Sequence, residues 1–393
     1  MPSLLRTLLR IGLALGALLA LLVIGVLVDA WESFGGRADG ARRARMEASP
    51  QWGDGAFRNA TPMWNDVAGS VFSLGEASPY AEAEAPVPVV PGDRSRFAQA
   101  PETGLRVTWL GHSTLFIEVD GHRFLTDPVF GGRASPVDWA GPKPWYAPPI
   151  PLGELPVPDA VLISHDHYDH LQMSTIRAMA TWDTTFIVPL GVGAHLEAWG
   201  VPTEHIAEHD WWETERFGAV TVTLTPARHA SGRQVFDQMG TLWGGYALVG
   251  PEHRVYFSGD TGLFDELADI GEQLGPFDVT MFEAGAYARY WPDWHLGPEN
   301  AVRAHELVRG EVLLPIHWGL WNLAMHGWTE PAERTLAEVA RRGARAYLPK
   351  PGESFEPERL PAMDRWWPEL PWETVAQTPI QPTGLRAETL RRP

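Results

Sequence analysis

The pattern of apolar and polar positions divides the chain into three stretches, of which the first is the most apolar. Ile11 to Val28 reads IGLALGALLALLVIGVLV, 18 positions without a charged or polar side chain. As a helix this run would extend about 27 Å, close to the hydrocarbon thickness of a bilayer. We therefore predict a single-pass membrane anchor in residues 1–30. A cleaved signal peptide is the alternative, although the apolar core of such a peptide usually has only about 7–15 residues.

Arginines flank this predicted anchor on both sides. Arg6 and Arg10 favour a cytoplasmic N-terminus, whereas four arginines between residues 37 and 45 favour the opposite orientation. We expect the globular part of the chain on the external, periplasmic side of the membrane, and the reverse orientation stays open.

The second stretch, residues 31–100, ends in AEAEAPVPVVPGDRSRFAQAP. We interpret residues 31–100 as a juxtamembrane extension and linker, and the proline and alanine content of this last part predicts an extended connector. Residues 101–355 then form a globular domain and residues 356–393 a C-terminal tail. Trp31 and the tail sequence RWWPELPWE carry aromatic side chains that could lie at a membrane interface. For any single tryptophan, however, burial in a core is the favoured interpretation.

The third stretch begins near residue 105, where apolar and polar residues alternate. LRVTWLGHSTLFIEVDGHRFLTD alternates around Asp120-Gly121, which predicts two antiparallel strands joined by a tight hairpin. Seven further β-rich runs follow: DAVLIS, TTFIVP, VTVTLTPA, WGGYALVG, HRVYFSGD, DVTMFEAG and EVLLPIHW. Helices are predicted between several of them, at 174–181, 264–274, 299–308 and 331–341. Strands and helices mixed in this way indicate a layered α/β architecture.

The composition excludes several classes of function. A formal net charge of −18 argues against nucleic acid as a partner, because affinity for the phosphate backbone comes from clustered lysine and arginine. The absence of cysteine excludes disulfides, thiolate zinc sites and cysteine nucleophiles. Hydrophobic residues make up 45% of the chain, enough for a sizeable core.

The densest group of potential metal ligands lies in LISHDHYDHL, residues 162–171, directly after a buried apolar run. The edge of a sheet beyond the carboxyl ends of its strands is where open α/β proteins usually place their chemistry. His165 and His167 are two positions apart and can point the same way, and Asp169 and His170 follow on the turn into a helix. HDHYDH offers up to five ligands, more than one tetrahedral ion can use, so it could serve two metal ions.

Further candidate ligands occur in the same context elsewhere. His229 follows VTVTLTPAR, Asp260 closes RVYFSGD and His317 closes EVLLPIH. Each is the first strong metal ligand after an apolar strand. Because metal sites need ligands held in a fixed geometry, strand ends suit them.

These motifs resemble the metallo-β-lactamase superfamily, whose His-x-His-x-Asp-His signature matches residues 165–170. More narrowly, residues 105–355 resemble the N-acyl-phosphatidylethanolamine phospholipase D branch and its bacterial relatives. The matching segments are TWLGHSTLFIEVDGHRFLTDPVF, RASPVDWAGPKPW, LISHDHYDHL, VPLGV, TPARH, LWGGYALVG, SGDTG and IHWG. The resemblance implies a four-layer αββα sandwich. It also implies two divalent metal ions, zinc foremost, at one edge of the sandwich. It does not extend to the apolar run, which by its length predicts the N-terminal transmembrane helix, or to the tail after residue 356.

The resemblance also implies the role of each ligand. The first metal would be held by His165, His167 and His229, the second by Asp169, His170 and His317, and Asp260 would bridge the two. Among these, Asp169 and Asp260 are the expected catalytic carboxylates. His112 is expected to support the site without binding metal.

On this basis we expect a membrane-anchored, zinc-dependent hydrolase. The leading hypothesis is a phospholipase D-like phosphodiesterase that cleaves (N-acyl) glycerophospholipids through a metal-bridging hydroxide. The alternatives are a lactonase or carboxylic ester hydrolase of the same fold, and a non-catalytic metal-binding membrane protein. His295 could contact the substrate phosphate or protonate the leaving group, with a purely structural role as the equal alternative. Substrate choice is expected in loops 128–150, 230–242 and 286–297, and an exposed sheet edge leaves a homodimer open.

Overall fold

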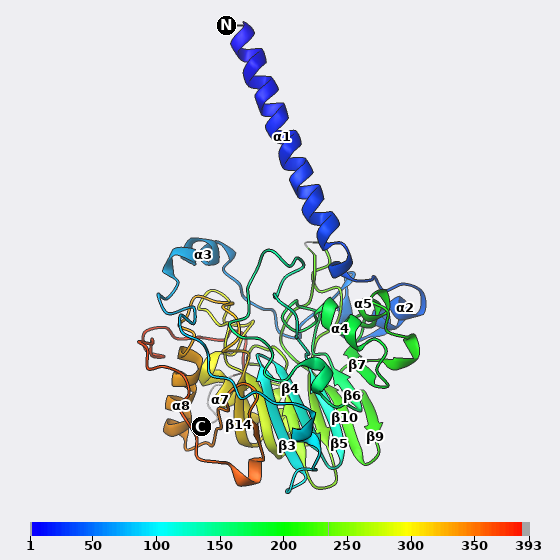
Figure 1. The fold of residues 1–393 in the computed structure, drawn as a ribbon, viewed down its shortest axis with the longest axis vertical. Helices are drawn as coiled ribbons and strands as arrows, with labels where there is room; N and C mark the ends of the chain where they lie inside the picture. Colours follow the sequence, from blue (N-terminus) through cyan, green and yellow to red (C-terminus); the bar gives the residue numbers. More distant parts are fainter. Residues whose placement is uncertain (1, 235, 387–393) are drawn as a thin grey trace.

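The computed structural model describes residues 2–234 and 236–386. The predicted apolar run lies inside one long helix, α1 (Pro2–Ala30), which projects away from the rest of the molecule (Figure 1). Its segment Leu5–Ala30 has a mean hydropathy of 2.9 in its most apolar window, and none of that window is buried. An anchor and a signal sequence both have these properties, so membrane anchoring stays a prediction.

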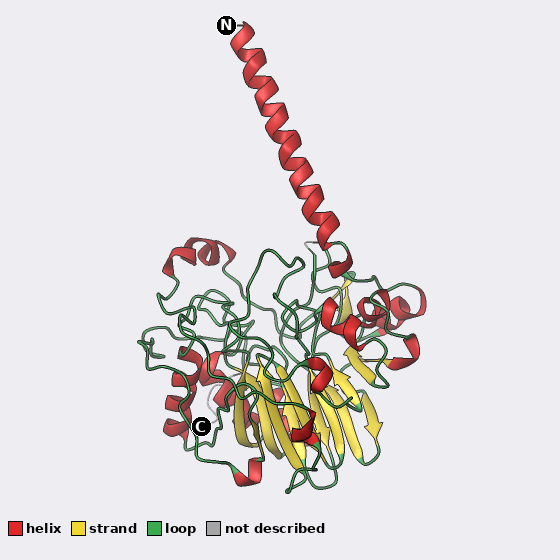
Figure 2. Cartoon of the chain, viewed as in Figure 1, coloured by secondary structure: helices red, strands yellow, loops and turns green. Residues whose placement is uncertain are grey.

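Two large sheets form the body of the molecule, shown in yellow in Figure 2. Antiparallel pairing joins β3, β4 and β5, after which β5 to β8 run parallel. The hairpin predicted at Asp120-Gly121 joins β4 to β5, and both residues have positive φ, as a tight hairpin requires. In order across the sheet, the strands are β15 (Ser354–Phe355), β3 (Leu105–Gly111), β4 (Thr114–Val119), β5 (His122–Thr126), β6 (Ala160–Leu162), β7 (Thr185–Pro189) and β8 (Ile206–His209).

The second sheet is antiparallel from β9 to β12 and parallel from β12 to β14. In order across the sheet, the strands are β14 (Gly310–Ile316), β13 (Phe277–Glu283), β12 (Arg254–Phe257), β11 (Gly245–Val249), β10 (Val220–Thr225) and β9 (Thr214–Phe217). The parallel parts of both sheets bring the carboxyl ends of several strands to the same edge, the arrangement that positions the site.

Three apolar clusters separate the layers. The largest lies between the two sheets and includes Trp109 and Tyr246, neither of which has more than 1% of its surface exposed. A second cluster packs the first sheet against α4 (Met173–Met179) and α5 (Gly193–Ala198). A third packs the second sheet against α6 (Leu267–Gln273) and α7 (Gly297–Leu307). The order helix, sheet, sheet, helix is the predicted αββα sandwich.

All four predicted helices are present, with ends displaced by at most three residues; the fourth is α8 (Glu330–Arg342), which packs on α7. Residues 31–100 were predicted as an extension that ends in an extended connector, and the part before that connector is folded. It contains α2 (Gly40–Ala48), the hairpin of β1 (Trp52–Gly53) with β2 (Ala56–Phe57), and α3 (Val67–Phe72). Met46 and Phe57 are buried in the core between the sheets, so this part of the extension is packed onto the domain.

The tail after residue 356 is also packed. Trp366 and Trp367 are buried, and the ring of Trp366 stacks on that of Trp318 with centroids 5.3 Å apart. These two tail tryptophans are therefore core residues, as favoured for any single tryptophan. Trp31, at the end of α1, is 72% exposed.

Candidate metal centre

The potential ligands predicted at strand ends all lie at one edge of the sandwich. His165 follows β6, Asp260 follows β12 and His317 directly follows β14, all parallel strands whose carboxyl ends share that edge. His229 follows β10 of the second sheet. Each of these residues therefore lies shortly after the end of a strand, which holds its loop in place.

One group of imidazoles converges from two loops. His165 Nε2 lies 2.9 Å from His167 Nδ1, and His229 Nε2 lies 3.3 Å from the same atom. With three ring nitrogens facing one another, hydrogen bonds among them cannot satisfy all three. Ligands of a tetrahedral zinc ion with bonds of about 2.0–2.1 Å are roughly 3.3 Å apart, so the spacing suits a cation of that size.

A second group lies beside the first. His317 Nε2 is 3.2 Å from Asp169 Oδ2 and 3.1 Å from His170 Nε2. His112 Nε2 is 3.1 Å from the same oxygen of Asp169, while the carbonyl of His112 accepts a hydrogen bond from the backbone nitrogen of His317. His112 thus contacts two members of the group. Its ring nitrogen also lies within 4.8 Å of possible ligand atoms of Asp169, His170 and His317, so its role as a support that does not bind metal stays a prediction.

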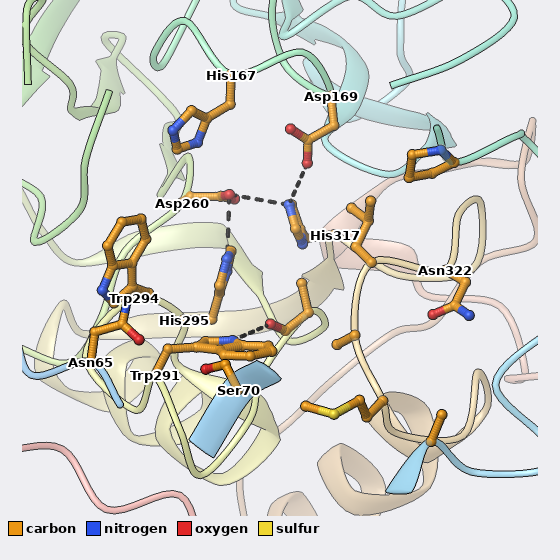
Figure 3. A pocket seen from close by; sticks show the side chains of 16 residues that line it. Asn65, Ser70, His167, Asp169, Asp260, Trp291, Trp294, His295, His317 and Asn322 are labelled. Atoms are coloured by element: carbon orange, nitrogen blue, oxygen red, sulfur yellow. Dashed lines mark hydrogen bonds and ion pairs between the residues drawn. The ribbon is translucent and has the colours of Figure 1, made fainter. Parts of the chain in front are cut away.

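Asp260 lies between the two groups, and Figure 3 shows its carboxylate facing His317 and His295. Its Oδ2 is 3.1 Å from both His170 Nε2 and His317 Nε2, and 3.9 and 3.8 Å from the Nε2 atoms of His165 and His229. Its Oδ1 is buried without a hydrogen-bond partner. A buried carboxylate with one oxygen unsatisfied and the other facing four imidazoles fits a position that bridges two cations.

Hydrogen bonds behind the imidazoles fix which nitrogen faces the centre. His170 Nδ1 donates to Asp127 Oδ2 at 2.7 Å, and His229 Nδ1 donates to the Trp294 carbonyl at 3.0 Å. His165 Nδ1 lies 2.9 Å from the Ser164 hydroxyl. With Nδ1 engaged, the Nε2 lone pair of each ring can bind a metal ion.

The charges of the centre are strongly perturbed. Burial disfavours the charged form of His317, but the charge of Asp260 and a hydrogen bond to Asp169 outweigh it and raise the pKa of His317 to about 9. Against the effect of burial, His170 and His317 hold the pKa of Asp260 well below its usual range. Burial and the neighbouring His317 lower the pKa of His112 to about 3. Asp260 therefore stays charged, and its carboxylate favours positive charge on the neighbouring imidazoles.

Each of the seven predicted metal ligands belongs to a group of three or four residues. Within each group, the possible ligand atoms all lie within 4.8 Å of one another. One such group also contains His295, together with Asp260 and His317. His295 Nδ1 lies 3.9 Å from Asp260 Oδ2 and 3.6 Å from Glu283 Oε2. The structure thus brings together every residue expected at the site, and the assignment of ligands to individual metals stays a prediction.

Two buried carboxylates at the centre were not predicted. Asp127 follows β5 and Glu283 ends β13; neither has exposed surface, and burial raises the pKa of both. Both close an apolar strand in the sequence, the signal that singled out Asp260. A carboxylate at the end of an apolar strand can therefore be recognised in the sequence. The pattern does not tell whether it binds a metal ion or holds a residue that does. Asp166, within HDHYDH, turns away and accepts hydrogen bonds from Gly232 N and Thr241 Oγ1.

A cavity of about 780 Å³ opens above the centre. Its floor includes His167, Asp169, Asp260, His295 and His317, and Figure 3 shows Trp291 and Trp294 along one wall. Loops 128–150 and 286–297 contribute to the lining, as expected. Among the described residues, loop 230–242 contributes none, which differs from the expectation. Asn65, Ser70 and Ala77 of the extension and residues 322–325 line the cavity instead.

Comparison with known proteins agrees with this geometry. A model of the beta-lactamase superfamily domain matches residues 122–318. This chain belongs to the metallo-β-lactamase superfamily. An uncharacterized protein of Mycobacterium tuberculosis is 43% identical over 340 residues, which cover 83% of this chain and 89% of that protein.

Two further matches describe the fold and the wider family. The N-acyl-phosphatidylethanolamine-hydrolyzing phospholipase D 1 of Caenorhabditis elegans is 38% identical over 234 residues, covering 56% of this chain and 66% of that enzyme. Igni18, a metallo hydrolase of Ignicoccus hospitalis, is 23% identical, with a TM-score of 0.50 over 64% of this chain and 98% of its own. This superfamily member is thus a metal-dependent hydrolase of the metallo-β-lactamase fold.

Proposed function

We propose that this hydrolase is a membrane-anchored phosphodiesterase with two metal ions, zinc foremost, that cleaves glycerophospholipids or their N-acyl derivatives on the phosphatidyl side, as a phospholipase D does. The observation that carries the proposal is the position of Asp260 between two groups of imidazole and carboxylate ligands. Two-metal sites suit displacement at phosphorus because both the attacking and the leaving oxygen are stabilised.

The surroundings of the centre support a lipid phosphodiester. Two divalent cations against the carboxylates of Asp169 and Asp260 would leave net positive charge, which attracts a phosphodiester anion. The cavity is walled in part by apolar side chains, among them Trp291, Leu323 and Met325, which suit the hydrocarbon part of a lipid. The similarity to the phospholipase D of Caenorhabditis elegans supports the same substrate class.

When bound, the two ions would lower the pKa of a water molecule to near neutrality and stabilise charge on the reacting oxygens. The chain would hold them with His165, His167 and His229 on one side, with Asp169, His170 and His317 on the other, and with Asp260 between. Asp127 and the Trp294 carbonyl keep their imidazole partners in the tautomer that offers Nε2 to the metal.

His295 is the residue best placed to handle a proton on the substrate. It lines the cavity, and its Nδ1 faces the buried carboxylate of Glu283 at 3.6 Å. With Nδ1 turned to Glu283, Nε2 is the atom that can donate to a phosphate oxygen or to the leaving group. Glu283 Oε1 accepts a hydrogen bond from Leu296 N, which fixes the backbone beside His295.

The test is turnover by the full-length, zinc-loaded protein in lipid micelles. The panel contains phospholipids, N-acyl-phospholipids, a lactone and simple carboxylic esters, with products identified by mass spectrometry. We expect phosphatidic acid to form, and to be absent both after chelation and in a His167→Ala variant. If the lipids stay intact while a lactone or ester opens, the substrate is a carboxyl compound. If a fully metallated protein hydrolyses nothing in the panel, the non-catalytic alternative gains.

A further inference from the structure

The end of α1 is fixed to the body of the molecule. Asp29 Oδ2 accepts a hydrogen bond from Trp139 Nε1 at 2.8 Å. The carbonyl of Glu32 accepts from Trp199 Nε1 at 2.7 Å, and its carboxylate pairs with Arg177 at 3.0 Å. Because these bonds come from three different segments of the domain, the direction of α1 relative to the body is set.

The chain just beyond these contacts is held closely as well. A Cβ on Gly36 would lie 2.2 Å from the carbonyl oxygen of Ala194, so only glycine allows this approach. Arg233 Nε donates to the carbonyl of Ser33 at 2.8 Å, which ties loop 230–242 to the same place. No flexible linker therefore separates the apolar helix from the domain.

The cavity above the metal centre is bordered by segments that lie at this end of the molecule. Asn65, Ser70 and Ala77, which lie in and around α3, line one side, and Pro142 lines another. Pro142 belongs to the same loop as Trp139, which is bonded to the end of α1. Figure 1 shows α3 and the base of α1 at the same end of the body, with the two sheets extending away from them.

Exposed aromatic side chains occur in the segments at this end. Trp31, Trp64, Trp139 and Phe236, here called the aromatic rim, are 72%, 47%, 62% and 93% exposed. Trp31 follows α1, Trp64 precedes α3, Trp139 is bonded to Asp29, and Phe236 lies in the loop tied to Ser33. Tryptophan in particular favours the interface between bilayer and water, and α1 ends its apolar run at Ala30.

We propose that the cavity faces the bilayer that α1 crosses, with the aromatic rim in the headgroup layer, so that the centre receives lipid from the leaflet in which α1 ends. The inference builds on the anchor in the proposed function and adds the orientation of the site. Lipid then reaches the metal centre laterally from the membrane that holds the protein. A lipid in a separate vesicle is out of reach.

The natural absence of cysteine makes this testable with single cysteine variants. An environment-sensitive fluorophore is attached to Phe236→Cys, to Ala68→Cys in α3 and to Glu358→Cys. Glu358 lies in the short helix Pro357–Arg359, drawn in orange at the opposite end of the body in Figure 1, and is the matched exposed control. Leu18→Cys, in the middle of α1, reports whether the helix is inserted. Each full-length variant is reconstituted into phosphatidylcholine vesicles.

We expect the probes at 18, 68 and 236 to show blue-shifted emission and quenching by nitroxide-labelled lipid, with loss of quenching by aqueous iodide. The probe at 358 should respond only to iodide. If the probe at 18 lies in lipid while those at 68 and 236 behave like the probe at 358, the proposed orientation is wrong but α1 is still a membrane anchor. If the probe at 18 also lies in water, α1 is not inserted, and both the anchor and the proposed orientation are wrong. Neither result depends on turnover, so failure of the proposed activity is detected separately.

Discussion

Replacing Asp127 with Asn tests whether a buried carboxylate keeps His170 ready to bind a metal ion. Asp127 has no exposed surface. Its Oδ2 accepts from His170 Nδ1 at 2.7 Å and from Ser164 Oγ at 2.6 Å, and its Oδ1 accepts from Ser164 N at 2.7 Å. Asn preserves the size of the side chain but replaces one acceptor oxygen by an NH2 group. In either orientation of the amide, its NH2 group then faces a hydrogen-bond donor, either His170 Nδ1 or Ser164 N.

The size of the effect follows from these contacts. A hydrogen bond to a charged group contributes about 1.5–3 kcal/mol. Loss of the partner behind a metal-binding histidine typically lowers metal affinity or activity about 10–100-fold. At about 1.4 kcal/mol for each factor of ten, the two ranges overlap. We therefore expect zinc to bind Asp127→Asn about 10–100-fold more weakly than the natural protein.

Competition with a zinc-binding dye, using the full-length protein in detergent, measures the affinity. Asp278→Asn is the matched control, because Asp278 Oδ2 accepts from Arg254 N at 2.7 Å near the start of β13, far along the strand from the centre. It should bind zinc with unchanged affinity. A folded Asp127→Asn protein whose zinc affinity is within twofold of the natural value would refute the idea that Asp127 orients a metal-binding His170.

Other perturbations separate the remaining roles. Asp260→Asn should lose metal and activity together, as metal analysis and turnover would show; a fully metallated, fully active variant would contradict the bridging role. His295→Gln should lower kcat at least about tenfold with both metals retained, and Glu283→Gln should shift the pH profile of kcat; unchanged turnover would leave both residues structural. Burial lowers the pKa of His305 to about 4 from 6.5, so its neutral form contributes stability above pH 6.5 that is lost as the pH falls through 4. In urea unfolding between pH 7.5 and 4, His305→Gln should therefore lose about 3 kcal/mol less stability than the natural protein; equal losses would argue against the burial effect.

The parts of the site and fold that could be predicted are those in which a short sequence pattern itself determines the local structure. The HDHYDH segment and the strand-end residues Asp260 and His317 could be placed at one edge because parallel strands deliver their carboxyl ends there. The hairpin at Asp120-Gly121 could be placed because its backbone needs positive φ at both positions. Asp127 and Glu283 could be seen as strand-end carboxylates, but their distance from the metal ligands depends on how the two sheets pack.

The extension was the least predictable part because its contacts come from isolated residues. Met46 and Phe57 are single apolar residues among polar neighbours in the sequence. No helical or strand periodicity of apolar residues therefore predicts their burial. Asn59 donates from Nδ2 to the carbonyl of His229 at 2.7 Å and accepts at Oδ1 from His229 N at 3.1 Å. A segment expected to be a spacer therefore fixes the backbone of a predicted metal ligand.

Segments outside residues 122–318, the region that the superfamily model matches, also hold the loop that carries His295. Asp293, in that loop, is fully buried and accepts from Trp64 N at 2.8 Å, from Thr383 N at 2.7 Å and from Arg228 Nη1 at 3.0 Å. The extension and the tail thus meet at one carboxylate two residues before His295. Since Trp64 and Thr383 lie outside residues 122–318, the shape of the cavity depends on segments that the superfamily domain does not include. This is a physical reason why membership of the superfamily does not by itself identify the substrate.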